Sequence, residues 1–154
     1  MMKITNTAVI GAGVMGSAIA AHLANAGFPV LLLDVIPNGA TDRNAIARQA
    51  IERLLKTDPP AFMHTKAANL IRPGNIEDHL ISLKESDWII EAVLENVEVK
   101  RSLYRKLEEL RKNDSIVTSN TSTLRLAQLS EGLPQRFSRD FLVAHFFNPP
   151  RYVR

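Results

Sequence analysis

The stretch Thr7-Ala-Val-Ile-Gly11-Ala-Gly13-Val14-Met-Gly16-Ser-Ala-Ile-Ala20 decides the fold of this chain. It begins with an apolar run typical of a buried strand and passes through three glycines at the spacing G-x-G-x-x-G. Gly11 allows a sharp turn, Gly13 presents no Cβ to an approaching phosphate, and Gly16 allows close packing of the helix that follows from Val14. The stretch predicts a strand, a tight turn and a helix whose N-terminus binds a pyrophosphate, although glycines at this spacing also occur in ordinary turns.

The next apolar run, Val30-Leu-Leu-Leu-Asp34, ends in a carboxylate. Because the run is continuous rather than alternating, it predicts a buried strand of a parallel sheet. Asp34 is placed to accept hydrogen bonds from the hydroxyls of an adenosine ribose and to repel a 2′-phosphate. Val35-Ile-Pro37 offers no basic partner for such a phosphate, so the sequence favours NAD over NADP. The alternative is a solvated aspartate at the end of a strand.

Length and composition limit the classes of protein that this chain fits. Its 154 residues suffice for one domain with a core of its own, and its 45% hydrophobic and 23% charged residues are ordinary for a globular protein. A net charge of +3, from 19 basic and 16 acidic side chains, is too small and too scattered to indicate nucleic-acid binding. The chain has no cysteine, which excludes disulfides and thiolate chemistry and favours a reducing cytoplasm. With no signal peptide and no run of membrane-spanning length, we expect no membrane insertion, and we assign no metal ligands.

Strand-like and helix-like segments alternate along the sequence. Strands are predicted at Thr7–Ile10, Val30–Asp34, Ile71–Asn75, Ser86–Val93, Ser115–Thr118 and Phe141–Phe147. Helices are predicted at Val14–Ala26, Asn38–Lys56, Phe62–Leu70, Val97–Leu110 and Leu124–Leu129. Pro73 weakens the third strand and favours a place at the edge of the sheet. The alternation predicts an α/β fold with a doubly wound parallel sheet of the Rossmann type.

Polar side chains follow the later strands, at the edge where such sheets bind ligands. Glu95 and Lys100 follow the fourth strand, Ser119-Asn-Thr-Ser122 the fifth, and His145 and Asn148 end the sixth. The neutral imidazole of His145 is suited to act as a general base near pH 7. Each feature also has an ordinary explanation, namely a structural histidine, a helix cap in the serine-rich stretch and a solvated ion pair.

Together these stretches resemble the L-3-hydroxyacyl-CoA dehydrogenases. The glycine motif, Glu91-Ala-Val-Leu-Glu95 with Lys100, Ser119-Asn-Thr-Ser122 and His145-Phe-Phe-Asn-Pro149 occur in that family in the same order. The resemblance spans nearly the whole chain, and its last two motifs are the specific ones. The continuation Pro150-Arg-Tyr is most similar to long bacterial fatty-acid β-oxidation proteins, which fuse this dehydrogenase to an enoyl-CoA hydratase-like part.

The resemblance implies that a cytoplasmic enzyme oxidises L-3-hydroxyacyl-CoA to 3-oxoacyl-CoA with NAD. His145 would remove the 3-hydroxyl proton as hydride passes to the nicotinamide, and Ser122 would reach the substrate oxygen. Besides the glycine turn with Val14, the implied NAD contacts are Met15, Asp34, Glu95, Lys100, Ser122 and Asn148.

Two parts of the family pattern fall outside the sequence. In the family, a glutamate about a dozen residues after the histidine orients the imidazole, as the acid does in a catalytic triad. That position lies beyond Arg154, as does the helical C-terminal domain that closes over acyl-CoA and forms the dimer. We therefore expect residues 1–154 to be the NAD-binding domain of a longer enzyme, able to bind NAD but catalytically incomplete. An apolar patch around Phe146, Phe147 and Tyr152 is expected to cause self-association or to belong to a disordered tail.

Two other interpretations stay open from the sequence. One is a 3-hydroxyacid dehydrogenase that shares the G-x-G-x-M-G turn, although the stretch His145–Pro149 argues against it. The other is a dinucleotide-binding module without catalytic activity, since a fold alone does not define a function.

Overall fold

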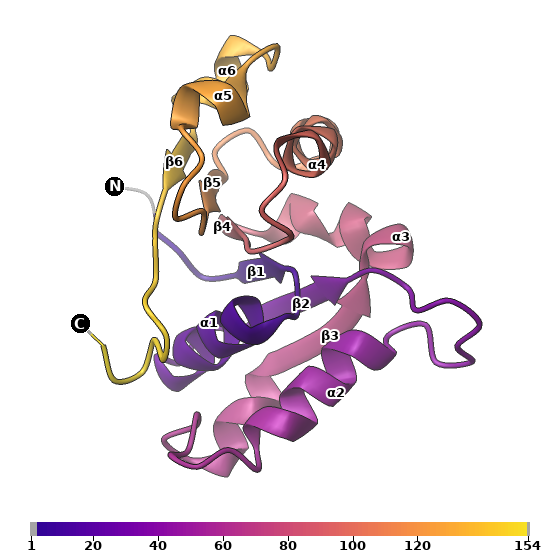
Figure 1. Ribbon diagram of the computed structural model, residues 1–154, viewed down its shortest axis with the longest axis vertical. Helices are drawn as coiled ribbons and strands as arrows, with labels where there is room; N and C mark the ends of the chain where they lie inside the picture. The colour runs from indigo at the N-terminus through magenta and orange to yellow at the C-terminus, as the bar shows by residue number, and fades with distance from the viewer. Residues whose placement is uncertain (1–2, 154) are drawn as a thin grey trace.

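The chain folds around a six-stranded parallel sheet with the strand order β3-β2-β1-β4-β5-β6 (Figure 1). This architecture comes from a computed structural model, which describes residues 3–153. The strands are β1 (Thr7–Ile10), β2 (Val30–Asp34), β3 (Ile71–Asn75), β4 (Trp88–Glu91), β5 (Ile116–Ser119) and β6 (Phe141–Val143). Strand β1 pairs with β2 on one side and with β4 on the other, so the predicted doubly wound parallel sheet is confirmed.

Helices cover both faces of the sheet. They are α1 (Val14–Asn25), α2 (Ala45–Leu54), α3 (Ile76–His79), α4 (Val97–Leu110), α5 (Leu126–Ser130) and α6 (Gln135–Arg139), with 3₁₀ helices η1 (Thr65–Leu70) and η2 (Leu80–Glu85). In Figure 1, α1 and α2 lie on one side of the sheet and α4 lies on the other. None of the helices within residues 3–153 is both long enough and apolar enough to span a bilayer.

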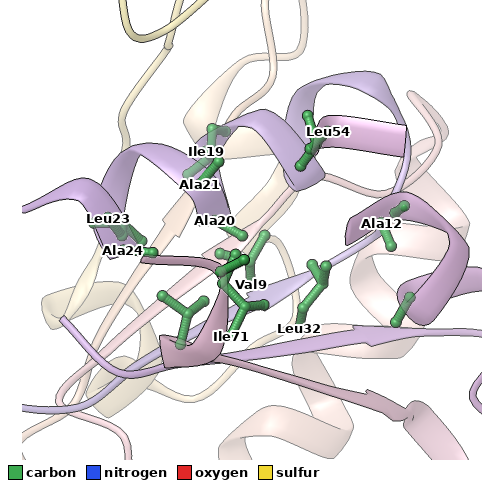
Figure 2. Packing of buried hydrophobic residues seen from close by; sticks show 14 of the residues in the cluster. Val9, Ala12, Ile19, Ala20, Ala21, Leu23, Ala24, Leu32, Leu54 and Ile71 are labelled. Carbon is green, nitrogen blue, oxygen red and sulfur yellow. The ribbon is translucent and has the colours of Figure 1, made fainter. Parts of the chain in front are cut away.

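Two apolar clusters hold these layers together, one on each face of the sheet. Val9 of β1 and Leu32 of β2 pack with residues of α1 and α2, as Figure 2 shows. Their strand neighbours Ala8 and Ile10 point to the opposite face and pack with residues of α4. Successive side chains of a strand point to opposite faces, which explains why these runs are apolar at every position.

The observed bounds of the helices differ from the predicted bounds in several places. Helix α2 begins at Ala45 rather than Asn38, because the Asp42 carboxylate accepts a hydrogen bond from the Asn44 N–H (2.9 Å) and holds the preceding residues in a turn. Only Thr65–Leu70 of the predicted helical piece is helical, as a 3₁₀ helix. The helices α3, η2 and α6 were not predicted, since each is too short to show a helical period.

The two edge strands differ from each other in how well they were predicted. Strand β3 has its predicted bounds and lies at one edge of the sheet with Pro73, so that prediction is confirmed. Strand β6 lies at the other edge and ends at Val143 rather than at Phe147. The Ala144 N–H still bonds the Ser119 carbonyl (3.0 Å), but the Phe146 N–H bonds the Asn120 side-chain oxygen (2.8 Å) instead of a strand neighbour.

Candidate functional site

The glycine turn joins β1 to α1 at the carboxyl edge of the sheet, which we define as the edge where the strands end. Gly11 has a φ of +102°, and a Cβ there would lie 2.4 Å from the Ala92 carbonyl oxygen, so only glycine fits. A Cβ on Gly16 would lie 1.7 Å from the Gly11 carbonyl oxygen, so this glycine allows α1 to pack against the turn. A Cβ on Gly13 would meet nothing within 4 Å. Gly13 therefore faces open space.

That open space belongs to a cleft of about 1040 Å³. Gly13 is the N-cap residue of α1, and no side chain caps this end of the helix. The first N–H groups of a helix have no intrahelical partner, so the start of α1 is suited to bind an anion in the cleft. Of the predicted site residues, the cleft is lined by Gly11, Gly13, Val14, Met15, Asp34, Glu95, Lys100 and Ser122.

Asp34 forms the wall of the cleft on the β2 side. Its carboxylate accepts hydrogen bonds from the backbone N–H groups of Ala12 and Val35. The first of these bonds links the end of β2 to the glycine turn, so Asp34 also holds the shape of that turn. A carboxylate has lone pairs for further donors, and Asp34 is only half-buried, so it remains able to accept from a ribose hydroxyl.

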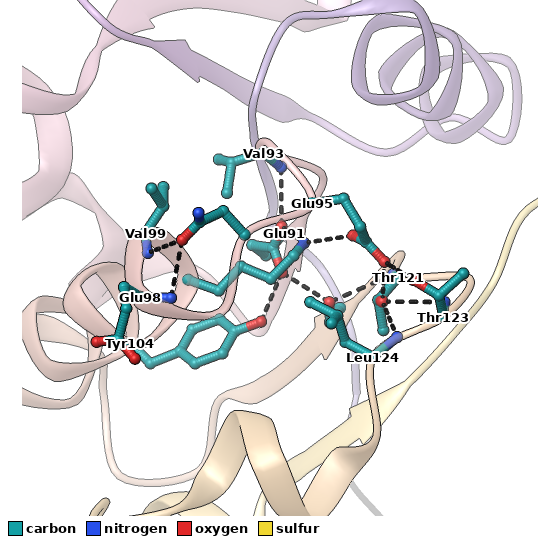
Figure 3. Close-up of polar contacts among 12 residues, drawn as sticks. Glu91, Val93, Glu95, Glu98, Val99, Tyr104, Thr121, Thr123 and Leu124 are labelled. Atoms are coloured by element: carbon teal, nitrogen blue, oxygen red, sulfur yellow. Dashed lines mark hydrogen bonds and ion pairs between the residues drawn. The ribbon is translucent and has the colours of Figure 1, made fainter.

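Glu95 and Lys100 form the opposite wall, where β4 continues into α4. The Lys100 ammonium lies 3.3 Å from the Glu95 carboxylate, and Glu95 also accepts hydrogen bonds from the hydroxyls of Thr121 and Thr123 (Figure 3). Burial alone would raise the pKa of Glu95, but the two threonine hydroxyls and the charge of Lys100 outweigh it and hold the pKa below its usual range. Asn96 caps the start of α4 by accepting from the N–H groups of Glu98 and Val99.

The structure adds a buried carboxylate that the sequence analysis did not assign to the site. Glu91 ends β4, its side chain is 0% exposed, and its nearest charged partner is the Lys100 ammonium at 2.6 Å. The hydroxyl of Tyr104 also donates to Glu91. Burial, followed by the charge of Glu91 and this hydrogen bond, raises the pKa of Tyr104 well above its usual range, so the phenol stays a donor. The signal in the sequence was an acid directly following the apolar residues Trp88-Ile-Ile90.

His145 and Asn148 are not among the residues that line the cleft. His145 is exposed and stacks edge-on against the Phe147 ring at a centroid distance of 4.7 Å. Within residues 3–153, its ring has no hydrogen-bonded carboxylate. Ser122 is exposed and lines the cleft. Asn148 lines a second hollow of about 340 Å³, which shares Val14 with the cleft.

The segment after β6 lies along α1 and the loop that follows α2. The Arg151 guanidinium donates to the carbonyl oxygens of Pro60 (2.5 Å) and Phe62 (2.9 Å), and the Tyr152 hydroxyl donates to Pro60 (2.9 Å). The expectation of a disordered tail is therefore wrong for residues 144–153. Phe147 is 60% exposed and Tyr152 is 47% exposed, as predicted. Phe146 is instead half-buried, because it packs against the cluster beneath α1.

A parallel sheet of this order, with a glycine turn and an uncapped helix start at the carboxyl edge, defines the dinucleotide-binding class of proteins. The family model described as "3-hydroxyacyl-CoA dehydrogenase, NAD binding domain" matches residues 6–154. The chain belongs to this family and is an NAD-binding domain. This match favours the resemblance inferred from the sequence over a 3-hydroxyacid dehydrogenase of the G-x-G-x-M-G type.

Individual relatives agree with the family. A probable 3-hydroxyacyl-CoA dehydrogenase of Deinococcus radiodurans is 51% identical over 99% of this chain and 44% of its own length. The fatty acid oxidation complex subunit alpha of Psychrobacter arcticus is 34% identical over 96% of this chain and 20% of its own length. The crystal structure of 3-hydroxybutyryl-CoA dehydrogenase from Escherichia coli superposes with a TM-score of 0.79, at 26% identity, over 98% of this chain and 31% of that one. The chain thus spans less than half of the length of these relatives.

Proposed function

We propose that this chain is the NAD-binding part of an oxidoreductase that converts L-3-hydroxyacyl-CoA to 3-oxoacyl-CoA. The observation that carries the proposal is the open face of Gly13 beside the uncapped start of α1. This point lies between β1 and β4, where the strand order reverses and such sheets bind nucleotides. The substrate class rests on the relatives, which carry 3-hydroxyacyl-CoA or fatty acid oxidation in their names.

The glycine turn and the β2 side of the cleft fit the pyrophosphate and the adenosine of NAD. The backbone from Gly11 to Gly16, with Val14 and Met15, would surround the pyrophosphate, because a side chain at Gly13 would fill the space that the phosphates need. Asp34 would accept from the adenosine ribose. Its negative charge would disfavour the additional phosphate of NADP.

The β4 and β5 side of the cleft would hold the nicotinamide half, with Glu95, Lys100 and Ser122 as its polar groups. Asn148 would approach from the neighbouring hollow, which meets the cleft at Val14. When bound, NAD supplies the hydride acceptor of the reaction.

His145 is proposed as the base that takes the 3-hydroxyl proton, and Ser122 as a donor to the substrate oxygen. His145 follows β6 by two residues, at the same edge of the sheet as the cleft. An imidazole without an orienting acid is a weak catalyst, since losing that acid in a catalytic triad costs about 10⁴ in rate. Because the chain spans 44% of the D. radiodurans relative, we propose that it works as the NAD-binding domain of a longer enzyme whose remaining part binds acyl-CoA.

Two further properties belong to this proposal. The lack of cysteine supports a reducing compartment, and we propose the cytoplasm. The exposed apolar side chains Leu142, Val143 and Phe147 lie on or just after the edge strand β6 and support self-association of the isolated chain.

Calorimetric titration of this chain with NAD and with NADP tests the cofactor assignment. We expect NAD to bind more tightly, because Asp34 opposes the 2′-phosphate. Equal affinities would contradict this role of Asp34. A steady-state assay with 3-hydroxybutyryl-CoA and NAD tests the rest. We expect turnover about 10⁴ slower than that of the full-length D. radiodurans relative, and comparable rates would show that the chain is catalytically complete.

A further inference from the structure

Glu91 is a buried carboxylate at the carboxyl edge that accepts four hydrogen bonds. One carboxylate oxygen accepts from the Val93 N–H (2.8 Å) and from the Lys100 ammonium (2.6 Å). The other accepts from the hydroxyls of Tyr104 (2.5 Å) and Ser119 (2.7 Å), as Figure 3 shows. These donors come from the loop after β4, from α4 and from β5. Glu91 therefore ties together the three elements that build the nicotinamide side of the cleft.

Lys100 connects this buried carboxylate to the surface of the cleft. Its side chain is only 1% exposed, yet it lines the cleft, and its ammonium lies between Glu91 and Glu95. Glu95 is 39% exposed and lines the cleft as well. The three charged groups thus form a row from the core to the cleft. An ammonium has three hydrogens, so these two carboxylates leave Lys100 a donor for a ligand.

We propose that Glu91 is a positioning residue that fixes Lys100, and through it Glu95, for the nicotinamide half of the cofactor. A lysine has a flexible four-carbon stem, and fixing it before binding removes the entropy cost of ordering it on the ligand. Glu91 itself does not touch the cofactor in this role. The inference rests on the proposed function, because it takes NAD as the ligand of the cleft.

The adenosine side of the cleft gives the proposal a direct test. Asp34 bonds to Ala12 and Val35, and neither contact involves Glu91. We therefore expect Glu91→Gln to weaken NAD about tenfold, the effect of one hydrogen bond between charged groups, while ADP binding stays within about twofold. Both affinities are measured by calorimetry on the 154-residue chain. Equal weakening of NAD and ADP would overturn the proposal, because a merely structural role affects both ligands alike.

A double-mutant cycle tests whether Glu91 acts through Lys100. Lys100→Met alone should weaken NAD, and adding Glu91→Gln to it should cause no further loss. A further loss equal to that of the single variant would show that Glu91 acts by another route. Glu108→Gln is the matched control, since Glu108 is a half-buried carboxylate of α4 that accepts from Arg111 (2.7 Å) and does not line the cleft. It should leave NAD affinity unchanged.

Tyr104→Phe keeps the proposal testable if Glu91→Gln does not fold. This variant removes only one of the donors to Glu91, and it should weaken NAD by roughly threefold with no change for ADP. An unchanged NAD affinity in this variant would count against the proposal. If the unmodified chain binds neither NAD nor ADP, the proposed function fails. If it binds both and the variants change neither, only the positioning role of Glu91 fails.

Discussion

The two edges of the sheet both carry buried charges, and the cleft of about 1040 Å³ lies at the carboxyl edge. At the amino edge, where the strands begin, Arg111 is 0% exposed and donates to Glu108 (2.7 Å), Asp140 (3.1 Å) and the Ser115 carbonyl (2.8 Å). At the carboxyl edge, Glu91 is equally buried and equally bonded. Both groups contact α4, which passes from one edge to the other.

The difference lies in what surrounds each charge. The Arg111 guanidinium lies 5.7 Å from the centre of the Phe137 ring, and its bonding partners are protein atoms within the described chain. The Glu91 group continues through Lys100 into the cleft. Both buried charges are satisfied, as stability requires, so burial of a charge does not identify a site. Our proposed site rests instead on the open face of Gly13 and the cleft beside it.

The largest expected effect is at the carboxyl edge, from Gly13→Val. Because a Cβ at Gly13 meets no protein atom within 4 Å, the variant should fold with nearly unchanged stability. The new side chain would occupy the space of the pyrophosphate, and NAD binding should fall by more than about 100-fold, or 2.8 kcal/mol. Calorimetry and urea unfolding measure the two effects.

Gly16→Val provides the contrast within the same turn. Its Cβ would lie 1.7 Å from the Gly11 carbonyl oxygen, so we expect a large loss of stability. Normal NAD affinity in Gly13→Val would remove the phosphate role from the glycine turn.

Arg111→Met, at the amino edge, should lower the stability of the fold by an amount comparable to the loss of binding energy in Gly13→Val. It should not change NAD affinity. Removing one partner of a buried ion pair leaves the others unpaired, and such changes cost about 3–5 kcal/mol. The free energy of unfolding in urea should fall by this amount. Material that remains folded should bind NAD with unchanged affinity, and a changed affinity would mean that the two edges are coupled through α4.

Asp34→Ala should have an intermediate effect, confined to the carboxyl edge. Losing hydrogen bonds to a charged group should weaken NAD by about 1.5–3 kcal/mol. NADP should lose less, because the variant also removes the repulsion of its 2′-phosphate. The ratio of the two dissociation constants measures this directly, and an unchanged ratio would contradict the role of Asp34 in selecting the cofactor.

The smallest expected effect is a loss of stability at low pH, which arises from two carboxylates at the amino edge. A hydrogen bond from Arg139, opposed by burial and supported by Arg111, holds the pKa of Asp140 below its usual value. Burial alone would raise the pKa of Asp87, but hydrogen bonds from Lys112, Asn6 and Thr5 outweigh it and lower the pKa. Both carboxyls therefore bind protons more weakly in the folded state.

Their contribution to stability is complete above the unfolded pKa of about 4 and is lost as the pH falls below it. We expect the urea midpoint to fall between pH 5 and pH 3. Asp140→Asn should be less stable at pH 6 and should show a shallower fall, whereas an identical fall would exclude Asp140 as a contributor.

The sequence predicts the strands and the glycine turn well, because their signals are local. The run Val30–Asp34 and the helix Val97–Leu110 appear with their predicted bounds. The turn before Ala45 was missed, because a hydrogen bond from one backbone N–H to an aspartate leaves no periodic pattern. The end of β6 was missed for a similar reason, since the Asn120 side chain takes over the Phe146 N–H there.

The sequence predicted several of the residues that line the cleft, but not how they are arranged there. Asp34, Glu95, Lys100 and Ser122 meet in one cleft because parallel strands end at the same edge. Spacing alone did not show that Lys100 turns inward to Glu91. The sequence analysis kept a solvated ion pair with Glu95 as the alternative for Lys100, whereas the structure buries Lys100 against the Glu91 carboxylate. That contact depends on the tertiary packing of α4 on β4.

The pairing of β1 with β4 has a consequence for the dynamics of the chain. It joins two segments, 7–75 and 88–143, whose other strand pairings are each internal to one segment. Contacts between distant parts of a chain form late in folding, so we expect this seam to open before either segment unfolds. The amide of Ala92, which bonds to the Ile10 carbonyl (2.8 Å), lies at the seam. With the free dinucleotide at about 100 times its dissociation constant, we expect hydrogen exchange at this amide to slow by roughly 100-fold. The bound ligand would then stabilise the pairing of the two segments against local opening.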